Sequence, residues 1–105
     1  MELDTEDCPP VDIPDGALFK ELLIVNKKGL HARASAKFVQ TVERFDAAVT
    51  VTRCGETVGG RSIMGLLTLG AAKGTTITVT AQGEDAAESL AAITQLVEGR
   101  FGEDE

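Results

Sequence analysis

His31 is the side chain in this sequence best suited by type and position to carry a covalent group transfer. It is the single histidine among 105 residues, and Gly29 precedes it while Arg33 follows it. A strand-like pattern gives way to a helical one here, so we expect His31 at the start of a helix, where unpaired backbone N–H groups bind anions. The guanidinium of Arg33 suits phosphate oxygens. The spacing therefore predicts a phosphoryl acceptor at His31, with the phosphate held by Arg33 and the backbone amides of Ala32 and Arg33.

Three lysines surround this histidine in the sequence: Lys27 and Lys28 before it, and Lys37 after it. Nearby positive charge favours the neutral, nucleophilic form of an imidazole. The same cations would guide an acidic partner protein to the site. The ordinary alternative is that these lysines are solvated surface charges and that the histidine is a polar residue at a loop–helix junction.

Ser62 is the second candidate site. It precedes an apolar segment that ends at Gly70, so its hydroxyl is expected to cap a short helix. That hydroxyl is also a candidate phosphorylation target, because a helix N-terminus tolerates a phosphate while the binding face gains negative charge. Apolar side chains beside it are expected to form a partner-binding patch: Ile63, Met64, Leu66 and Leu67.

The elements that must position these side chains follow from the hydrophobic periodicity. Strands are predicted at 18–25, 48–52, 57–58 and 76–81, and helices at 31–45, at 62–69 and between Asp85 and Gly99. Alternating strand patterns indicate a sheet with one solvated face. The prediction is an α+β, two-layer open-faced sandwich of β-α-β-β-α-β-α order, with a four-stranded antiparallel sheet and three helices on one face.

The charge is distributed unevenly. The net charge is −7, but residues 1–17 hold six acidic and no basic side chains, and residues 103–105 are all acidic. The body, 18–102, has ten basic and eight acidic side chains, too weak an excess to favour nucleic-acid binding. We predict an acidic, proline-containing, disordered tail at 1–17, one domain at 18–102 and an acidic tail at 103–105.

The cysteines and the first residues of the sequence indicate the cellular compartment in which the protein works. Cys8 and Cys54 are far apart in sequence and form no CxxC motif, so neither a disulfide framework nor a metal site is expected, and Cys54 is expected to be inert. The first residues lack the pattern of a secretory signal, and no apolar run is long enough to span a bilayer. We therefore expect a cytoplasmic protein without membrane insertion.

Several segments together resemble the HPr family, the histidine-containing phosphocarriers of the bacterial phosphotransferase system. The segments at 29–33 and 36–39 are similar to the family's active-site signature, and 60–70 is similar to its regulatory-serine segment. Residues 73–75 and 83–86 also fit in the right order, so the resemblance covers about 18–101. One departure is Ala34, where many sugar-transport members have proline; this alanine and the acidic end at 101–105 also resemble the nitrogen-branch paralogues.

The resemblance implies a function for each candidate residue. His31 would accept a phosphoryl group on Nδ1 from phosphorylated enzyme I, which is charged by phosphoenolpyruvate, and pass it to IIA proteins or domains. Arg33 would assist the phosphate, and Ser62 would be the target of an HPr kinase/phosphorylase. The protein would be a monomeric carrier rather than an enzyme, and would need no cofactor or metal.

Two other classes of function remain open from the sequence. A regulatory module that binds partners through the 62–70 patch, as in the nitrogen branch, would keep its activity without His31. A small RNA-binding domain would show salt-dependent affinity for nucleic acid, but the sequence lacks Tyr and Trp for base stacking.

Overall fold

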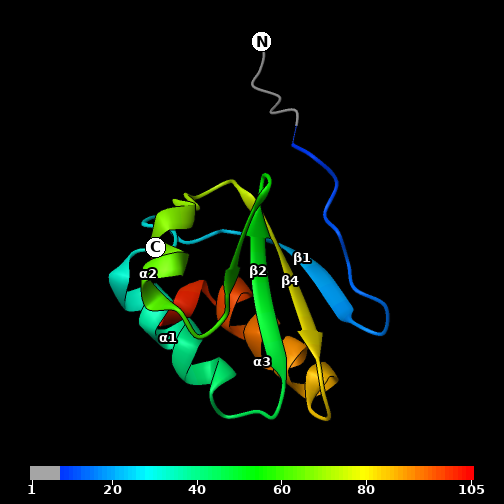
Figure 1. Ribbon diagram of the computed structural model, residues 1–105. Coiled ribbons are helices and arrows are strands. Elements are labelled where there is room, and N and C mark those ends of the chain that lie inside the picture. Colours follow the sequence, from blue (N-terminus) through cyan, green and yellow to red (C-terminus); the bar gives the residue numbers. More distant parts are fainter. Residues whose placement is uncertain (1–7) are drawn as a thin grey trace.

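The computed structural model describes residues 8–105 and has the predicted order of elements (Figure 1). The elements are β1 (Leu18–Leu23), α1 (Ala32–Val42), β2 (Ala48–Arg53), β3 (Glu56–Gly59), α2 (Ile63–Leu69), β4 (Thr76–Gln82), α3 (Ala86–Glu98) and a 3₁₀ turn, η1 (Arg100–Gly102). Within the described residues, no helix has both the length and the apolar character required to cross a bilayer.

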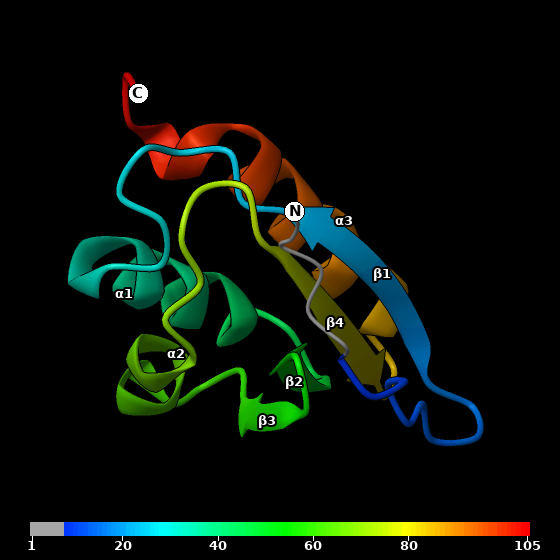
Figure 2. The same cartoon turned by 90° about the horizontal axis from the view of Figure 1, so that it is seen from above.

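The four strands form one antiparallel sheet in the order β1-β4-β2-β3, with the helices gathered on one face (Figure 2). This confirms the predicted open-faced sandwich. The core lies between the sheet and the helices, where Phe38 of α1, Val79 of β4 and Ile93 of α3 are fully buried. Burying side chains of this size supplies about 2 kcal/mol each, which holds the layer of helices against the sheet.

Helix α1 ends three residues earlier than predicted, at Val42. The amides of Arg44 and Phe45 bond to carbonyl oxygens three residues back, so the chain tightens and turns towards β2. The Phe45 ring is only half-buried, and the Arg44 guanidinium lies 5.3 Å from its centroid. Phe45 therefore does not continue the buried stripe of the helix.

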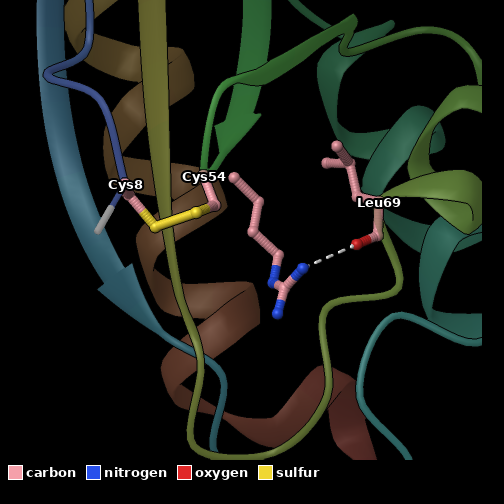
Figure 3. Close-up of a disulfide and its surroundings, with 4 residues drawn as sticks. Cys8, Cys54 and Leu69 are labelled. Carbon is pink, nitrogen blue, oxygen red and sulfur yellow. Dashed lines mark hydrogen bonds between the residues drawn. A yellow bond between two sulfur atoms is a disulfide. The ribbon is translucent and has the colours of Figure 1, made fainter. Parts of the chain in front are cut away.

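The expectation of unpaired cysteines is wrong, because Cys8 and Cys54 form a disulfide (Figure 3). Cys54 and Gly55 both have positive φ and make the two-residue turn of the β2–β3 hairpin. The segment 8–17, which we call the strap, runs on the side of the sheet away from α3 and reaches this turn (Figures 1 and 2). A Cβ at Gly55 would lie 3.2 Å from the Pro9 ring. This part of the predicted tail is therefore fastened at both ends; its first part, residues 1–7, lies outside the described residues.

The face of the sheet opposite the helices is less solvated than the alternation predicted. Thr78 and Thr80 of β4 point to this face, yet they are only 6% and 5% exposed. The hydroxyls of Thr50 and Thr80 are hydrogen-bonded to each other, and so are those of Thr52 and Thr57. Cross-strand pairing contributes to this burial, because Thr50 and Thr52 of β2 lie opposite Thr80 and Thr78 of β4.

Opening the disulfide is expected to lower the free energy of unfolding by about 1.4 kcal/mol. Its cysteines are 46 residues apart, and closing such a loop in the unfolded chain alone would give about 4 kcal/mol. In the folded protein, however, the sheet already holds Leu18 and Cys54, so reduction frees only the strap and the folded state also gains entropy. Urea unfolding with and without reductant measures the difference, and Cys8→Ser should match the reduced protein. A loss near 4 kcal/mol would show that the strap stays ordered without its disulfide.

Candidate functional site

His31 occupies the N-cap position of α1, as predicted, with extended backbone dihedrals and a side chain that makes no capping bond. Gly29 reaches a φ of +66°, and its amide bonds to the Asn26 carbonyl oxygen at 3.2 Å. The Leu30 amide donates to the Ala71 carbonyl oxygen at 2.9 Å, which ties this loop to the segment after α2. The turn therefore presents the imidazole at the end of the helix, with 24% of its side chain exposed.

Backbone donors and cations surround this position. The first backbone hydrogen bond of α1 runs from the Ser35 amide to the His31 carbonyl oxygen at 2.8 Å. The amides of Ala32 and Arg33 come before it, in the part of the helix where amides have no carbonyl partner within the helix. Beside them lies a cavity of about 380 Å³. Its lining combines Lys27, Lys28, Arg33 and Lys37 with residues 102–105. The structure thus gathers the predicted cations around one hollow that suits an anion.

Two of the three lysines also hold the end of the described chain in place. The Lys37 ammonium donates to the Phe101 carbonyl oxygen at 2.7 Å. The Lys27 ammonium forms an ion pair with the Glu105 carboxylate at 3.3 Å. The backbone amide of Lys27 also donates to the main-chain oxygen of Glu105 at 2.9 Å. The ion pair is exposed, so it stabilises this arrangement by no more than about 1 kcal/mol.

A carboxylate that the sequence analysis missed touches His31. Nε2 of the imidazole is hydrogen-bonded to the carboxylate of Glu103, which was assigned to a separate acidic tail. The turn that carries Glu103, at the red end of the ribbon, lies beside the loop that leads into α1 (Figure 2). The Asn26 side-chain amide donates to the other carboxylate oxygen at 3.1 Å and to the Gly29 carbonyl oxygen at 2.9 Å. The only signal for this contact in the sequence is charge. Residues 103–105 are acidic and Lys27 and Lys28 are basic, although the two segments are far apart in the chain.

The sequence predicts only positive charges around the His31 ring, but the structure also places a carboxylate in contact with it. Burial acts to raise the pKa of Glu103, but hydrogen bonds from His31 and Asn26 and the positive charges of His31 and Lys28 outweigh it, so this pKa is lowered. Glu103 is thus ionised over the physiological range. Its negative charge at Nε2 offsets part of the positive charge around the histidine.

The lowered pKa of Glu103 predicts a pH-dependent contribution to stability. A carboxylate whose pKa falls on folding stabilises the protein above its unfolded pKa of about 4.3, and this contribution disappears as the pH falls through the folded value. The gap in unfolding free energy between the wild type and Glu103→Gln should therefore be present at about pH 5 and shrink below about pH 4. Urea unfolding at several pH values measures it. Asp104→Asn, which alters an exposed neighbouring carboxylate, serves as the control; an equal trend there would point to general charge rather than to the Glu103 contacts.

Ser62 caps α2 as predicted, because its hydroxyl oxygen accepts from the Gly65 amide at 2.9 Å. Of the predicted patch, Met64 is 71% exposed and Ile63 39%, while Leu67 is half-buried. Leu66 is fully buried in the core, so its assignment to a binding patch is wrong. Positions three or four apart share a face of a helix, and the face that carries Leu66 and Leu69 packs inward.

Comparison with known proteins identifies the segment that contains both candidate sites. Residues 19–99 match the family profile described as PTS HPr component phosphorylation site. A curated relative, phosphocarrier protein HPr of Neisseria meningitidis serogroup A, is 51% identical over 88 residues, which cover 84% of this chain and 99% of that protein. The multiphosphoryl transfer protein of Salmonella typhimurium is 38% identical, over 87% of this chain and 25% of that protein.

Solved structures show the same similarity. The crystal structure of HPr-C-His from Thermoanaerobacter tengcongensis matches with a TM-score of 0.81 and 38% identity, covering 84% of this chain and 99% of that one. Fold, site geometry and sequence similarity thus agree over the same residues. The chain belongs to the HPr family of phosphocarrier proteins.

Proposed function

We propose that His31 is the phosphoryl acceptor of this phosphocarrier, taking the group on Nδ1 from phosphorylated enzyme I and passing it to IIA proteins or domains. The observation that carries the proposal is the position of the ring: it caps α1 beside a cavity lined by four cationic side chains. A dianionic phosphoryl group would be stabilised there by charge and by the helix dipole. The protein relays the group and turns over no small molecule of its own.

Arg33 and the amides of Ala32 and Arg33 are proposed to hold the phosphate. The two amides come before the first bonds of the helical ladder, and Arg33 lines the cavity. A planar guanidinium can bind two phosphate oxygens at once, which a lysine cannot do. Arg33 would therefore act on the phosphoryl group itself, while the lysines attract the acidic surface of a partner.

Removing His31 is expected to abolish phosphorylation. Wild type incubated with enzyme I and phosphoenolpyruvate should gain the mass of one phosphoryl group, which is lost in acid, whereas His31→Ala should gain none. Arg33→Ala should be phosphorylated at least about tenfold more slowly, because a charge-assisted contact to the transferring group is lost. Arg44→Ala, an exposed arginine just beyond α1, is the matched control and should behave as wild type. Acid-labile label on His31→Ala would overturn the proposal.

We further propose that phosphorylation of Ser62 by an HPr kinase/phosphorylase regulates the carrier. Its hydroxyl is exposed at the N-terminus of α2, beside the apolar surface of Ile63, Met64 and Leu67. A phosphate there adds about two negative charges to a surface that enzyme I would contact, so transfer to His31 should slow. ATP-dependent labelling should occur in wild type and be absent from Ser62→Ala, while Thr68→Ala, which changes an exposed hydroxyl on the same helix, should be labelled normally.

The proposed partners also define where the protein works. A carrier charged from phosphoenolpyruvate acts in the cytoplasm, as a monomer that meets enzyme I and IIA proteins in turn. Reducing conditions there would favour opening of the Cys8–Cys54 disulfide.

A further inference from the structure

Glu103, whose carboxylate contacts His31, lies beyond the match to the family profile, which ends at residue 99. It joins the N-cap of α1 to the segment after η1, two parts of the chain 72 residues apart. The side chains are only 24% and 15% exposed, so the contact is partly shielded from water. Binding of the phosphate by Arg33 and the amides at the start of α1 does not involve this carboxylate.

The carboxylate is held in place from several sides. Asn26, which is fully buried, donates to both the Glu103 carboxylate and the Gly29 carbonyl oxygen, so it fastens Glu103 to the loop before His31. Phe101 is fully buried two residues earlier, and its carbonyl oxygen accepts from Lys37. A side chain fixed through its neighbours and its own hydrogen bonds has the preorganisation that a positioning group needs.

An ionised carboxylate can only accept hydrogen bonds, so Glu103 holds a proton on Nε2 of His31. In the neutral imidazole the lone pair must then reside on Nδ1, and within residues 8–105 only Nε2 of this ring is hydrogen-bonded. We infer that Glu103 is a positioning residue for phosphoryl transfer, which selects Nδ1 as the nucleophile and stabilises the charge that the ring acquires. This inference rests on the proposed function, because it concerns the reactivity of the same histidine.

The Nδ1 lone pair forms a bond to phosphorus while the bond between phosphorus and the donor's leaving atom breaks, and the donor keeps that electron pair. No proton leaves His31, since Nε2 retains its own throughout, so the imidazole becomes positively charged as the N–P bond forms. A carboxylate at Nε2 stabilises that developing charge, in the way that a buried aspartate stabilises the imidazolium of a catalytic triad.

The negative charge of Glu103 does not exclude the incoming phosphoryl group. It lies on the Nε2 side of the ring, and the cavity beside it is lined by Lys27, Lys28, Arg33 and Lys37. Asp104 and Glu105 are the other acidic residues of the lining, and Glu105 is paired with Lys27. Cations therefore outnumber carboxylates around the site, while the one carboxylate in contact with the ring acts on the nitrogen that does not react.

The first test needs no phosphorylation. ¹⁵N NMR of the unmodified protein at alkaline pH should show a proton on Nε2 that is protected from exchange with water. Glu103→Ala should lose this protection and populate the other tautomer, whereas Glu103→Gln, which still offers a carbonyl oxygen, should keep most of it. Glu98→Gln removes the same charge from an exposed side chain at the end of α3, outside the cavity lining, and should match wild type. Equal spectra for wild type and Glu103→Ala would overturn the inference.

The second test measures transfer from phosphorylated enzyme I in the same pH range. We expect Glu103→Ala to reduce the rate about tenfold, Glu103→Gln to lie between it and wild type, and Glu98→Gln to have little effect. A normal rate for Glu103→Ala, with wild type labelled on His31, would defeat the inference and leave the proposed function standing. Absence of label on wild-type His31 would instead defeat the proposed function, while the tautomer measurement still decides whether Glu103 positions the ring.

Discussion

Gly29→Ala is expected to lower the free energy of unfolding by about 3 kcal/mol and to slow phosphorylation of His31 by about 100-fold. Gly29 has a φ of +66°, and a Cβ there would lie 2.3 Å from the Ala71 carbonyl oxygen and 2.9 Å from the Ala72 Cα. Both obstacles are backbone atoms, so the loop itself must move. That movement breaks the bond from the Leu30 amide to Ala71 and displaces His31, two residues further on.

Gly70→Ala is the matched control for this prediction. Gly70 has a nearly equal φ of +61°, but a Cβ there would meet nothing within 4 Å. Its substitution should therefore carry only the dihedral penalty, about 1 kcal/mol, and leave the phosphorylation rate near wild type. Urea unfolding and the enzyme I assay measure both variants. Equal losses at the two glycines would show that close packing of the His31 loop against residues 71–72 is unimportant.

Phe101→Ala is expected to cost about 3–5 kcal/mol of unfolding free energy, the usual result of removing a fully buried aromatic ring. Phe101 has no exposed surface, and it anchors the turn that delivers Glu103 to His31. The carboxylate should lose its fixed position when this anchor is removed. The transfer rate of Phe101→Ala, measured at a temperature where the variant is folded, should then resemble that of Glu103→Ala.

A double-mutant cycle tests this coupling. Adding Glu103→Ala to Phe101→Ala should change the transfer rate little, because the first substitution has already released the carboxylate. Phe19→Ala is the control, since the ring of Phe19 is 55% exposed on β1 and its loss should cost less than about 1 kcal/mol. Fully additive effects of the two substitutions on the rate would mean that Glu103 reaches His31 without the help of Phe101.

The sequence by itself determined the order of the elements, the sandwich fold and the ends of helices at His31, Ser62 and Gly70. These features follow from local rules: the apolar period separates strand from helix, serine oxygens satisfy first-turn amides, and glycine adopts the left-handed dihedrals that end a helix. The sequence also predicts His31 and Arg33 as site residues from local rules, because both belong to one short segment.

Only the tertiary structure decided which distant residues meet. Cys8 pairs with Cys54, and Glu103 reaches His31, because the strap and η1 pack against the domain in specific places. Composition predicts a disordered tail at 1–17 and an acidic tail at 103–105, since acidic and proline-rich segments bury little surface by themselves. Their positions depend instead on partners 46 and 72 residues away, a disulfide at one end and a buried phenylalanine with a charged contact at the other. Such long-range contacts have no period in the sequence, so only the folded chain shows them.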